Sequence, residues 1–228
     1  RDLHTAYRRQ LQMCIRDSDS RGHGQSEAPK GPYSIEMLAD DAAALLDVLD
    51  IKSVHFCGLS KGGMVAQMMG VRHADKVKSL TIADSAAFMP AKDTWEQRIQ
   101  AVTNGGMEAV VDPTTERWIT SEGRDRLPGQ VELIRQMILK TPVQGFVACS
   151  EAIKSMDMRT TNPKISAPTL VICGEQDTGT TPQQAKEIAD AIPNAKLELI
   201  SDAAHLANIE QHEVFNRLLS HFLANLDG

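Results

Sequence analysis

The chain has 228 residues, of which 42% are hydrophobic, and this size and composition fit one globular domain with a sizeable core and an inserted subdomain. Its formal net charge of -6 argues against a nucleic-acid-binding groove, because phosphate binding needs a concentrated positive surface. Four scattered cysteines indicate neither a disulfide framework nor a zinc site, and no apolar run reaches the ~18 residues of a membrane span, so we expect a cytoplasmic protein.

The first predicted helix follows an N-terminal segment that resembles none of the later elements. Residues 1–18 contain four arginines and no regular alternation of polar and apolar residues, so they predict neither strands nor a signal peptide. Ser34 is a candidate helix cap. The residues after it have the spacing of one apolar helix face: Ile35, Leu38, Ala39, Ala42, Leu45, Leu46 and Leu49.

The most informative motif is a serine between two glycines, Gly58-Leu59-Ser60-Lys61-Gly62, at the end of an apolar run that starts at Val54. This pattern predicts a sharp strand-to-helix turn that exposes the serine hydroxyl and directs the following backbone N–H groups to the same place. We expect glycines there because neighbouring chain passes too close for a Cβ atom. Ser60 is therefore the candidate nucleophile. His55, inside the apolar strand, is expected to be a core histidine with a satisfied ring.

The rest of the chain alternates strands with helices. Strands are predicted at 80–83, 169–173 and 197–200, a helix begins at Pro182 and runs to Ile192, and a closing helix carries Val214 to Leu226. Between residues 89 and 167 only helical stretches occur, at 95–102, 131–139 and 146–156. The pattern predicts an α/β fold with a mostly parallel sheet flanked by helices, in which residues 19–88 and 168–228 form the core and residues 89–167 a helical cap.

Ser60 needs a base, since a serine hydroxyl is a poor nucleophile until its proton is removed. Asp177 follows the 169–173 strand and His205 follows the 197–200 strand. Because the loops after parallel strands gather at one edge of the sheet, we expect the three residues to meet there, with His205 as base and Asp177 as its partner. Glu175 and Asp202 compete for the role of Asp177.

The chain resembles the α/β-hydrolase superfamily and, within it, the 3-oxoadipate enol-lactonases. The superfamily features are the D-x-R-G-H-G-x-S loop at 19–26, the turn around Ser60, and the late Asp177 and His205. The enol-lactonase features are the segments Trp95-Glu96-Gln97-Arg98 and Glu116-Arg117-Trp118. The similarity runs from about Asp19 to the C-terminus.

This resemblance implies a serine hydrolase that opens a carboxylate-bearing enol lactone through an acyl-enzyme and needs no metal or organic cofactor. Its partner is a small-molecule lactone or ester, with no nucleic acid and no membrane. The backbone N–H of Lys61 would hold the oxyanion. Three other classes stay open. The first is another hydrolase of this superfamily, such as a carboxylesterase, a cofactor-free haloperoxidase or a C–C bond hydrolase. The second is a non-catalytic binding relative, and the third is an inactive fragment.

Substrate contacts are expected from the cap. Trp118 and Trp95 are candidates for an apolar wall, although filling the core of the cap is the alternative for both. The substrate carboxylate needs a cation in this acidic protein, and Arg117 and Lys61 are the candidates, with further arginines nearby in the sequence, namely Arg98, Arg124 and Arg126. Lys61 has an alternative, in which its stem packs on apolar surface and its ammonium reaches solvent.

The front of the chain departs from the family pattern. Enol-lactonases begin with additional strands and a His-Gly loop that supplies a second oxyanion N–H, and residues 1–18 do not match them. We therefore predict that this segment is foreign to the hydrolase core, that the early strands are missing, and that one edge of the sheet lacks its partner.

Overall fold

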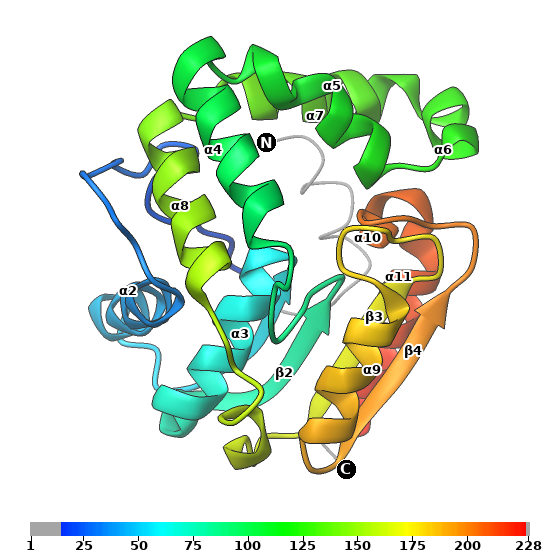
Figure 1. The fold of residues 1–228 in the computed structure, drawn as a ribbon. Coiled ribbons are helices and arrows are strands. Elements are labelled where there is room, and N and C mark those ends of the chain that lie inside the picture. The colour runs from blue at the N-terminus through cyan, green and yellow to red at the C-terminus, as the bar shows by residue number, and fades with distance from the viewer. Residues whose placement is uncertain (1–14, 227–228) are drawn as a thin grey trace.

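The computed structural model describes residues 15–226 (Figure 1). In chain order its elements are α2 (Ile35–Val48), β1 (Val54–Leu59), α3 (Lys61–Arg72), η1 (Ala74–Lys76), β2 (Val77–Ala83), α4 (Lys92–Gly105), α5 (Glu108–Trp118), α6 (Ser121–Arg126), α7 (Pro128–Leu139), α8 (Val143–Ser155), η2 (Asn162–Lys164), β3 (Thr169–Gly174), α9 (Pro182–Ala191), β4 (Ala195–Ile200), α10 (Ala207–Glu210) and α11 (His212–Ala224).

The four strands form one parallel sheet in the order β1-β2-β3-β4, covered by helices on both faces. Alternate residues of β3 point to opposite faces, as a strand requires. Val171 and Cys173 pack in a core cluster with residues of α2, α3 and α9, while Leu170 and Ile172 pack in another with Phe215 of α11. The fold class predicted from the sequence, a parallel sheet flanked by helices, is confirmed.

Helices α4 to α8 lie between β2 and β3 in the chain, in the interval for which we predict a cap. Figure 1 shows α4, α5, α6 and α7 gathered beyond the end of the sheet to which the strands point. Helices α4, α5 and α7 share a core cluster, which includes Val102, Val110 and Ile134 and is joined by Leu206 from the loop after β4. The sequence located α4, α7 and α8 but missed α5 and α6, because Pro113, inside α5, is typical of a helix boundary.

Helix α2 begins as predicted, with the Ser34 hydroxyl accepting a hydrogen bond from the Met37 N–H at 3.1 Å. Its buried residues are Ile35, Leu38, Ala39 and Ala43. Not all of the apolar series is buried, because near the end of the helix Leu45 is 40% and Leu49 43% exposed. Periodicity identifies a helix face, but neighbouring elements decide how far along the helix that face is covered.

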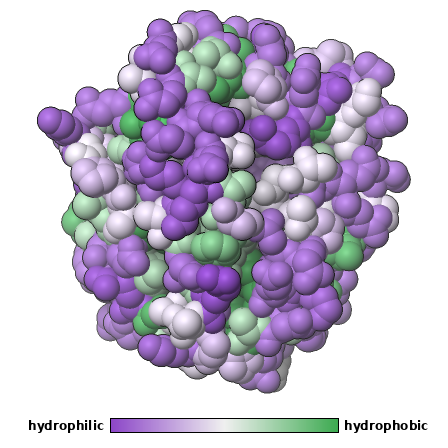
Figure 2. All heavy atoms as spheres, in the orientation of Figure 1, coloured by the Kyte–Doolittle hydropathy of each residue, from purple (hydrophilic) through white to green (hydrophobic). Residues whose placement is uncertain are grey.

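The segment that we set apart at 1–18 falls mainly outside the described residues, and residues 15–18 have no regular secondary structure. Within residues 15–226, β1 pairs only with β2. His55 Nδ1 on β1 lies 2.8 Å from the Ser79 hydroxyl, so its ring has the predicted partner, but the side chain is half-buried rather than in the core. None of the described helices is long and apolar enough to cross a membrane. On the face shown in Figure 2 hydrophilic side chains predominate and hydrophobic ones surface in small separate areas.

Candidate active site

Ser60 occupies a strained turn between β1 and α3. Its φ of 55° lies in the left-handed region, which a residue with a side chain rarely adopts. The segment after β2 holds this turn from both sides, because the Ser60 N–H donates to the Ala83 carbonyl at 2.8 Å and the Ser85 hydroxyl donates to the Ser60 carbonyl at 2.8 Å. The half-buried Ser60 side chain makes no helix-capping bond, so its hydroxyl is available to another partner.

The glycines around Ser60 differ in how much space a Cβ atom would have. A Cβ at Gly58 would lie 2.0 Å from the Gly62 carbonyl oxygen, and a Cβ at Gly63 would lie 2.6 Å from the Ser85 Cβ, so both positions need glycine. At Gly62 a Cβ would meet nothing within 4 Å. Our expectation of a close approach is therefore right for Gly58 and wrong for Gly62.

These contacts predict a large difference between two alanine substitutions in the same turn. Gly58→Ala should destabilise the protein by about 2–4 kcal/mol, because the methyl group overlaps backbone that cannot move without distorting the turn. Gly62→Ala should change the free energy of unfolding by less than about 1 kcal/mol, because the methyl group enters open space in a helix. Urea denaturation of both variants measures the difference, and equal losses would contradict the assignment of the clash to Gly58.

The structure brings Ser60, His205 and Asp177 together in one chain of hydrogen bonds. His205 Nε2 lies 2.9 Å from the Ser60 hydroxyl, and His205 Nδ1 lies 2.8 Å from Asp177 Oδ2. His205 is 5% and Asp177 2% exposed. The parallel strands explain the meeting, because the loops after β1, β3 and β4 leave the same edge of the sheet. An imidazole between a hydroxyl and a carboxylate is able to take a proton from the hydroxyl.

Asp177 is held as an anion. Burial alone would raise its pKa, but hydrogen bonding to His205, the charge of that residue, and bonds from Thr180 outweigh burial and lower the pKa below its ordinary value. Asp177 Oδ1 accepts from the N–H groups of Gly179 at 2.7 Å and Thr180 at 3.0 Å, and Oδ2 accepts from the Thr180 hydroxyl at 2.7 Å. The competing carboxylates of Glu175 and Asp202 are exposed.

The Lys61 side chain does not follow the alternative in which its ammonium reaches solvent. Its ammonium does not reach out to solvent but donates to the Ser20 hydroxyl at 2.9 Å and lies 3.3 Å from both His23 Nδ1 and Cys149 Sγ. Burial lowers the pKa of Lys61. Burial and the Lys61 charge together lower the pKa of His23 to about 4. The Lys61 backbone N–H is at the first position of α3, where a helix offers no internal acceptor.

The two cap tryptophans have different neighbours. The Trp118 ring lies beside the His205 ring, with centroids 5.8 Å apart and an angle of 30° between the planes, and it also packs on the core of α4 to α7. Trp95 packs against the core cluster that contains residues of α2, α3 and α9. The Arg98 guanidinium carbon lies over its ring, 4.8 Å from the ring centroid. Of the two, Trp118 is therefore the one in contact with the chain of hydrogen bonds.

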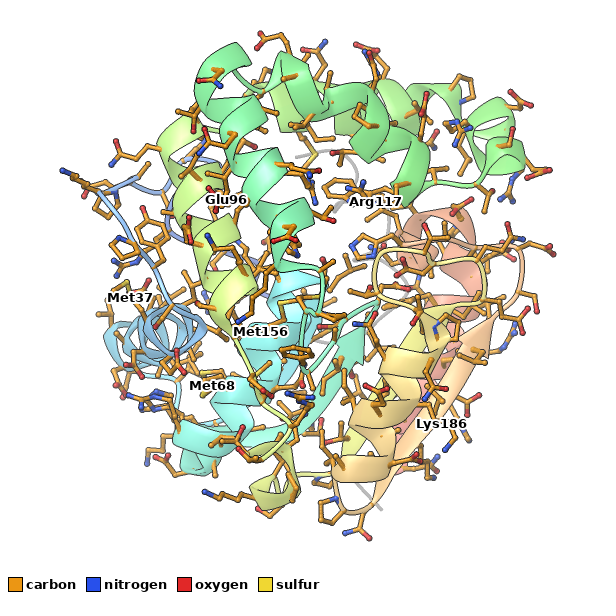
Figure 3. The ribbon with its side chains drawn as sticks, in the orientation of Figure 1. Met37, Met68, Glu96, Arg117, Met156 and Lys186 are labelled. Atoms are coloured by element: carbon orange, nitrogen blue, oxygen red, sulfur yellow. The ribbon has the colours of Figure 1, made fainter. Side chains whose placement is uncertain are left out.

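Among the described residues, two of the four candidate arginines donate hydrogen bonds to backbone carbonyls, and the other two do not. Arg124 donates to the carbonyls of Glu116 and Ile119, and Arg126 to the carbonyl of Glu210. Arg117 and Arg98 form no ion pair within residues 15–226, and Arg117 Nη2 is buried with no hydrogen-bond partner there. Figure 3 shows Arg117 at the lower edge of the α4–α7 layer, above the loop that follows β3.

Sequence reasoning missed two residues that support this site. The Thr180 hydroxyl lies 3.1 Å from His205 Nδ1 as well as bonding to Asp177. Buried Glu210 accepts from the Ala204 N–H at 2.8 Å and from the Thr120 hydroxyl at 2.6 Å, so it ties the loop of His205 to the cap. The Gly-Thr-Thr-Pro run after Asp177 reads as ordinary turn and helix-cap residues, and Glu210 carries no motif, so the sequence held no signal for either.

Three buried side chains have metal-binding atoms within 4.8 Å of one another: Asp84, Cys173 and Asp177. Their chemistry does not suit a metal ion. Burial raises the pKa of the Cys173 thiol strongly and that of Asp84 well above its ordinary value, which opposes the deprotonation that metal ligands require. Asp177 is already fully hydrogen-bonded.

Comparison with known proteins agrees with the fold. Residues 18–211 match the model of a family described as alpha/beta hydrolase fold. The chain is 34% identical over 198 residues to 3-oxoadipate enol-lactonase 2 of Acinetobacter baylyi, a match that covers 87% of this chain and 74% of that protein. Two solved structures are also similar: the enol-lactonase from Burkholderia xenovorans LB400 (TM-score 0.88, 38% identity, 90% of this chain and 79% of that one) and a thermophilic esterase from Thermogutta terrifontis with malate bound (TM-score 0.86, 30% identity, 91% and 78%).

Proposed function

The chain belongs to the α/β-hydrolase family, and on that premise we propose that it is a serine hydrolase that opens 3-oxoadipate enol-lactone, a carboxylate-bearing lactone, to 3-oxoadipate. The observation that supports hydrolysis most directly is the hydrogen-bonded series from Ser60 through His205 to Asp177 at 2.9 and 2.8 Å. The similarity to enol-lactonases supports the choice of substrate.

In the first half of the reaction Ser60 Oγ attacks the lactone carbonyl carbon while His205 Nε2 takes the hydroxyl proton. Asp177 stabilises the resulting imidazolium and holds Nδ1 protonated. The oxyanion is stabilised by the Lys61 N–H at the positive end of α3. The carbonyl carbon then expels the ring oxygen as an enol, to which His205 returns the proton, and the enol tautomerises to the ketone.

In the second half a water molecule hydrolyses the acyl-enzyme. His205 takes a proton from the water, the hydroxide adds to the acyl carbon, and Ser60 leaves with the proton that His205 returns. Because the enol was part of the same ring, the product leaves as one molecule with a ketone and a new carboxylate. No proton-transfer group beyond His205 is required.

The substrate is expected to bind between Trp118 and the arginines. Trp118, already beside His205, provides an apolar wall for a flat ring. Arg117 is the cation we assign to the substrate carboxylate, because its Nη2 is buried without a partner and its Nε lies 3.8 Å from where a Cβ at Gly179 would stand, next to Asp177. Burial lowers the pKa of Arg117, which an anionic ligand would offset.

Arg98 supports this assignment, and Lys61 does not. Burial and the nearby Arg117 charge lower the pKa of Arg98 to about 10, so two guanidinium groups stand close together. The carboxylate that acts on Arg117 is that of Asp177, which already bonds His205 and Thr180. Lys61 is less suitable because its ammonium is occupied by Ser20 and its neighbours. Trp95 is assigned to holding Arg98 through its ring rather than to touching the substrate.

The test compares two lactones that differ in one substituent: the enol lactone with its acetate arm, and the same ring with a methyl group in place of that arm, which lacks the carboxylate. Arg117→Met should lower kcat/KM for the carboxylate-bearing lactone about 10–100-fold, the effect of losing one charge-assisted contact. For the methyl lactone it should change kcat/KM by less than about threefold. Steady-state kinetics on both substrates measures the ratio.

Arg135→Met is the matched control, since Arg135 is in the same group of helices but pairs with Asp112 on the surface. It should leave both substrates unaffected. If the wild-type chain opens neither lactone, the proposed reaction is wrong. If it opens both and Arg117→Met affects them equally, the reaction stands and Arg117 does not recognise the carboxylate.

A further inference from the structure

Asp84 is a buried carboxyl group that the series of Ser60, His205 and Asp177 does not use. It is the first residue after β2, is 0% exposed and has a φ of 43°, in the left-handed region. Its Oδ2 is buried with no hydrogen-bond partner among the described residues. Both the backbone conformation and the unpaired oxygen cost stability, so this aspartate calls for a specific explanation.

The backbone around Asp84 connects the turn of Ser60 with the loop of Asp177. The Ser60 N–H donates to the carbonyl of Ala83, the residue before Asp84, at 2.8 Å. Asp84 itself donates its N–H to the Ile172 carbonyl on β3 at 2.8 Å, and its Oδ1 accepts the Gly174 N–H at 2.8 Å. Gly174 ends β3, and its carbonyl accepts the Asp177 N–H at 3.1 Å.

The same carboxyl group also reaches the loop of His205. A Cβ at Gly174 would lie 2.2 Å from the Ala204 carbonyl oxygen, so the backbone at Gly174 packs directly on the residue before His205. The Ala207 N–H, at the start of α10, faces the Asp84 carboxyl as well. A shift of Gly174 would therefore move both loops relative to Ser60.

We propose that Asp84 is a positioning residue whose Oδ1 fixes the loops of Asp177 and His205 relative to Ser60, in the form of an uncharged carboxylic acid. The proposal rests on the hydrolysis proposed above. The bond from Gly174 needs only an oxygen acceptor, which a neutral acid or an amide supplies. An ionised Asp84 would instead bring a second negative charge within 4.8 Å of the Asp177 oxygen that it faces.

The groups that surround Asp84 favour the protonated acid. Burial is the main cause that raises its pKa well above the ordinary value, and the negative charges of Asp177 and Glu210 act in the same direction. The N–H groups of Gly174 and Ala207 lower the pKa but do not compensate. The nearby Cys173 thiol has a raised pKa and supplies no charge.

Two substitutions distinguish the role of Asp84 as a hydrogen-bond acceptor from its role as a titratable acid. Asp84→Asn keeps an oxygen for the Gly174 N–H and removes the titration, whereas Asp84→Gly removes the acceptor and relieves the positive φ, so it should still fold. The probe is the rate at which a fluorophosphonate labels Ser60, together with kcat and KM for the enol lactone. Asp84→Gly should lower kcat and the labelling rate about 10–100-fold with KM within about twofold, and Asp84→Asn should stay within about threefold of wild type.

Asp50→Gly is the matched control, since Asp50 also has a positive φ, of 53°, but is exposed at the end of α2. It should leave the labelling rate unchanged. The proposal is overturned if Asp84→Gly labels as fast as wild type, or if Asp84→Asn loses as much rate as Asp84→Gly.

Two measurements do not depend on activity. Amide hydrogen exchange of residues 174–180 should be faster in Asp84→Gly and unchanged in Asp84→Asn, and unchanged exchange in both would refute the proposed role even if the chain proves inactive. A carboxyl group whose folded pKa is raised destabilises the fold progressively as pH rises above its unfolded pKa of about 4. Asp84→Asn should therefore melt above wild type by a margin that grows as pH rises above that value. A constant margin would mean that Asp84 is ionised.

Discussion

Replacing Ser60 by alanine should reduce kcat for the enol lactone by about 10⁶, because no other group is positioned to attack the carbonyl in its place. Stability should change little, since within residues 15–226 the hydroxyl has its hydrogen bond with His205 alone, and the strained turn is held by backbone groups and by Ser85. Steady-state kinetics and mass spectrometry after fluorophosphonate treatment measure the loss of turnover and of the labelled peptide.

Ser155→Ala is a suitable control, since Ser155 is exposed and its hydroxyl bonds, in the described part of the chain, to carbonyls of its own helix α8. It should keep full activity and remain unlabelled at that site. A Ser60→Ala protein that retained more than about 1% of the wild-type rate would rule out the acyl-enzyme on Ser60.

The second large effect is expected for Asp177→Asn, at about 10⁴ in kcat. Asp177 Oδ1 accepts two backbone N–H groups, so the asparagine oxygen must stay there and its NH₂ must face His205 Nδ1. That amide donates to Nδ1 and so moves the ring proton to Nε2, where it prevents the imidazole from accepting the Ser60 proton. The pH–rate profile and the tautomer seen by NMR of the His205 ring measure the change.

The same substitution has a defined effect on stability. Because the folded pKa of Asp177 is below its ordinary value, the ionised carboxylate stabilises the fold above about pH 4, and this contribution is lost as pH falls through the folded pKa. Wild type should therefore exceed Asp177→Asn in melting temperature at pH 7, and the difference should shrink on acidification. Glu175→Gln and Asp202→Asn are matched controls, and a 10⁴-fold loss in either would move the acid to that residue.

Local patterns were sufficient wherever a short segment determines its own geometry. The turn at Ser60 could be recognised from its glycines, and its φ of 55° is the conformation that the motif implies. The Ser34 cap and the start of α9 at Pro182 followed from capping preferences that involve only three or four residues. The order of strands and helices likewise indicated a parallel sheet.

Local patterns failed where the outcome depends on neighbours distant in sequence. Helix α5 was missed because Pro113 is typical of a helix boundary, although the helix continues through this residue. The apolar spacing of α2 included Leu45 and Leu49, which the fold leaves exposed. For Lys61 the sequence offered a solvated ammonium or a substrate contact, and the fold instead bonds it to Ser20, 41 positions away.

The sequence by itself indicated the family, the sheet with its helices, and the candidates Ser60 and His205, because each of these follows from motifs or from the periodicity of single segments. For the acid it favoured Asp177 but left Glu175 and Asp202 as competitors. Only the tertiary structure decided that Asp177 rather than Glu175 or Asp202 bonds His205, that among the described residues Arg117 Nη2 is buried without a hydrogen-bond partner, and that Asp84 accepts the Gly174 N–H. Those choices depend on which side chains meet when β2, β3 and the helices pack. A hydrogen bond is decided by tenths of an ångström between groups 28 to 145 positions apart, which no local pattern contains.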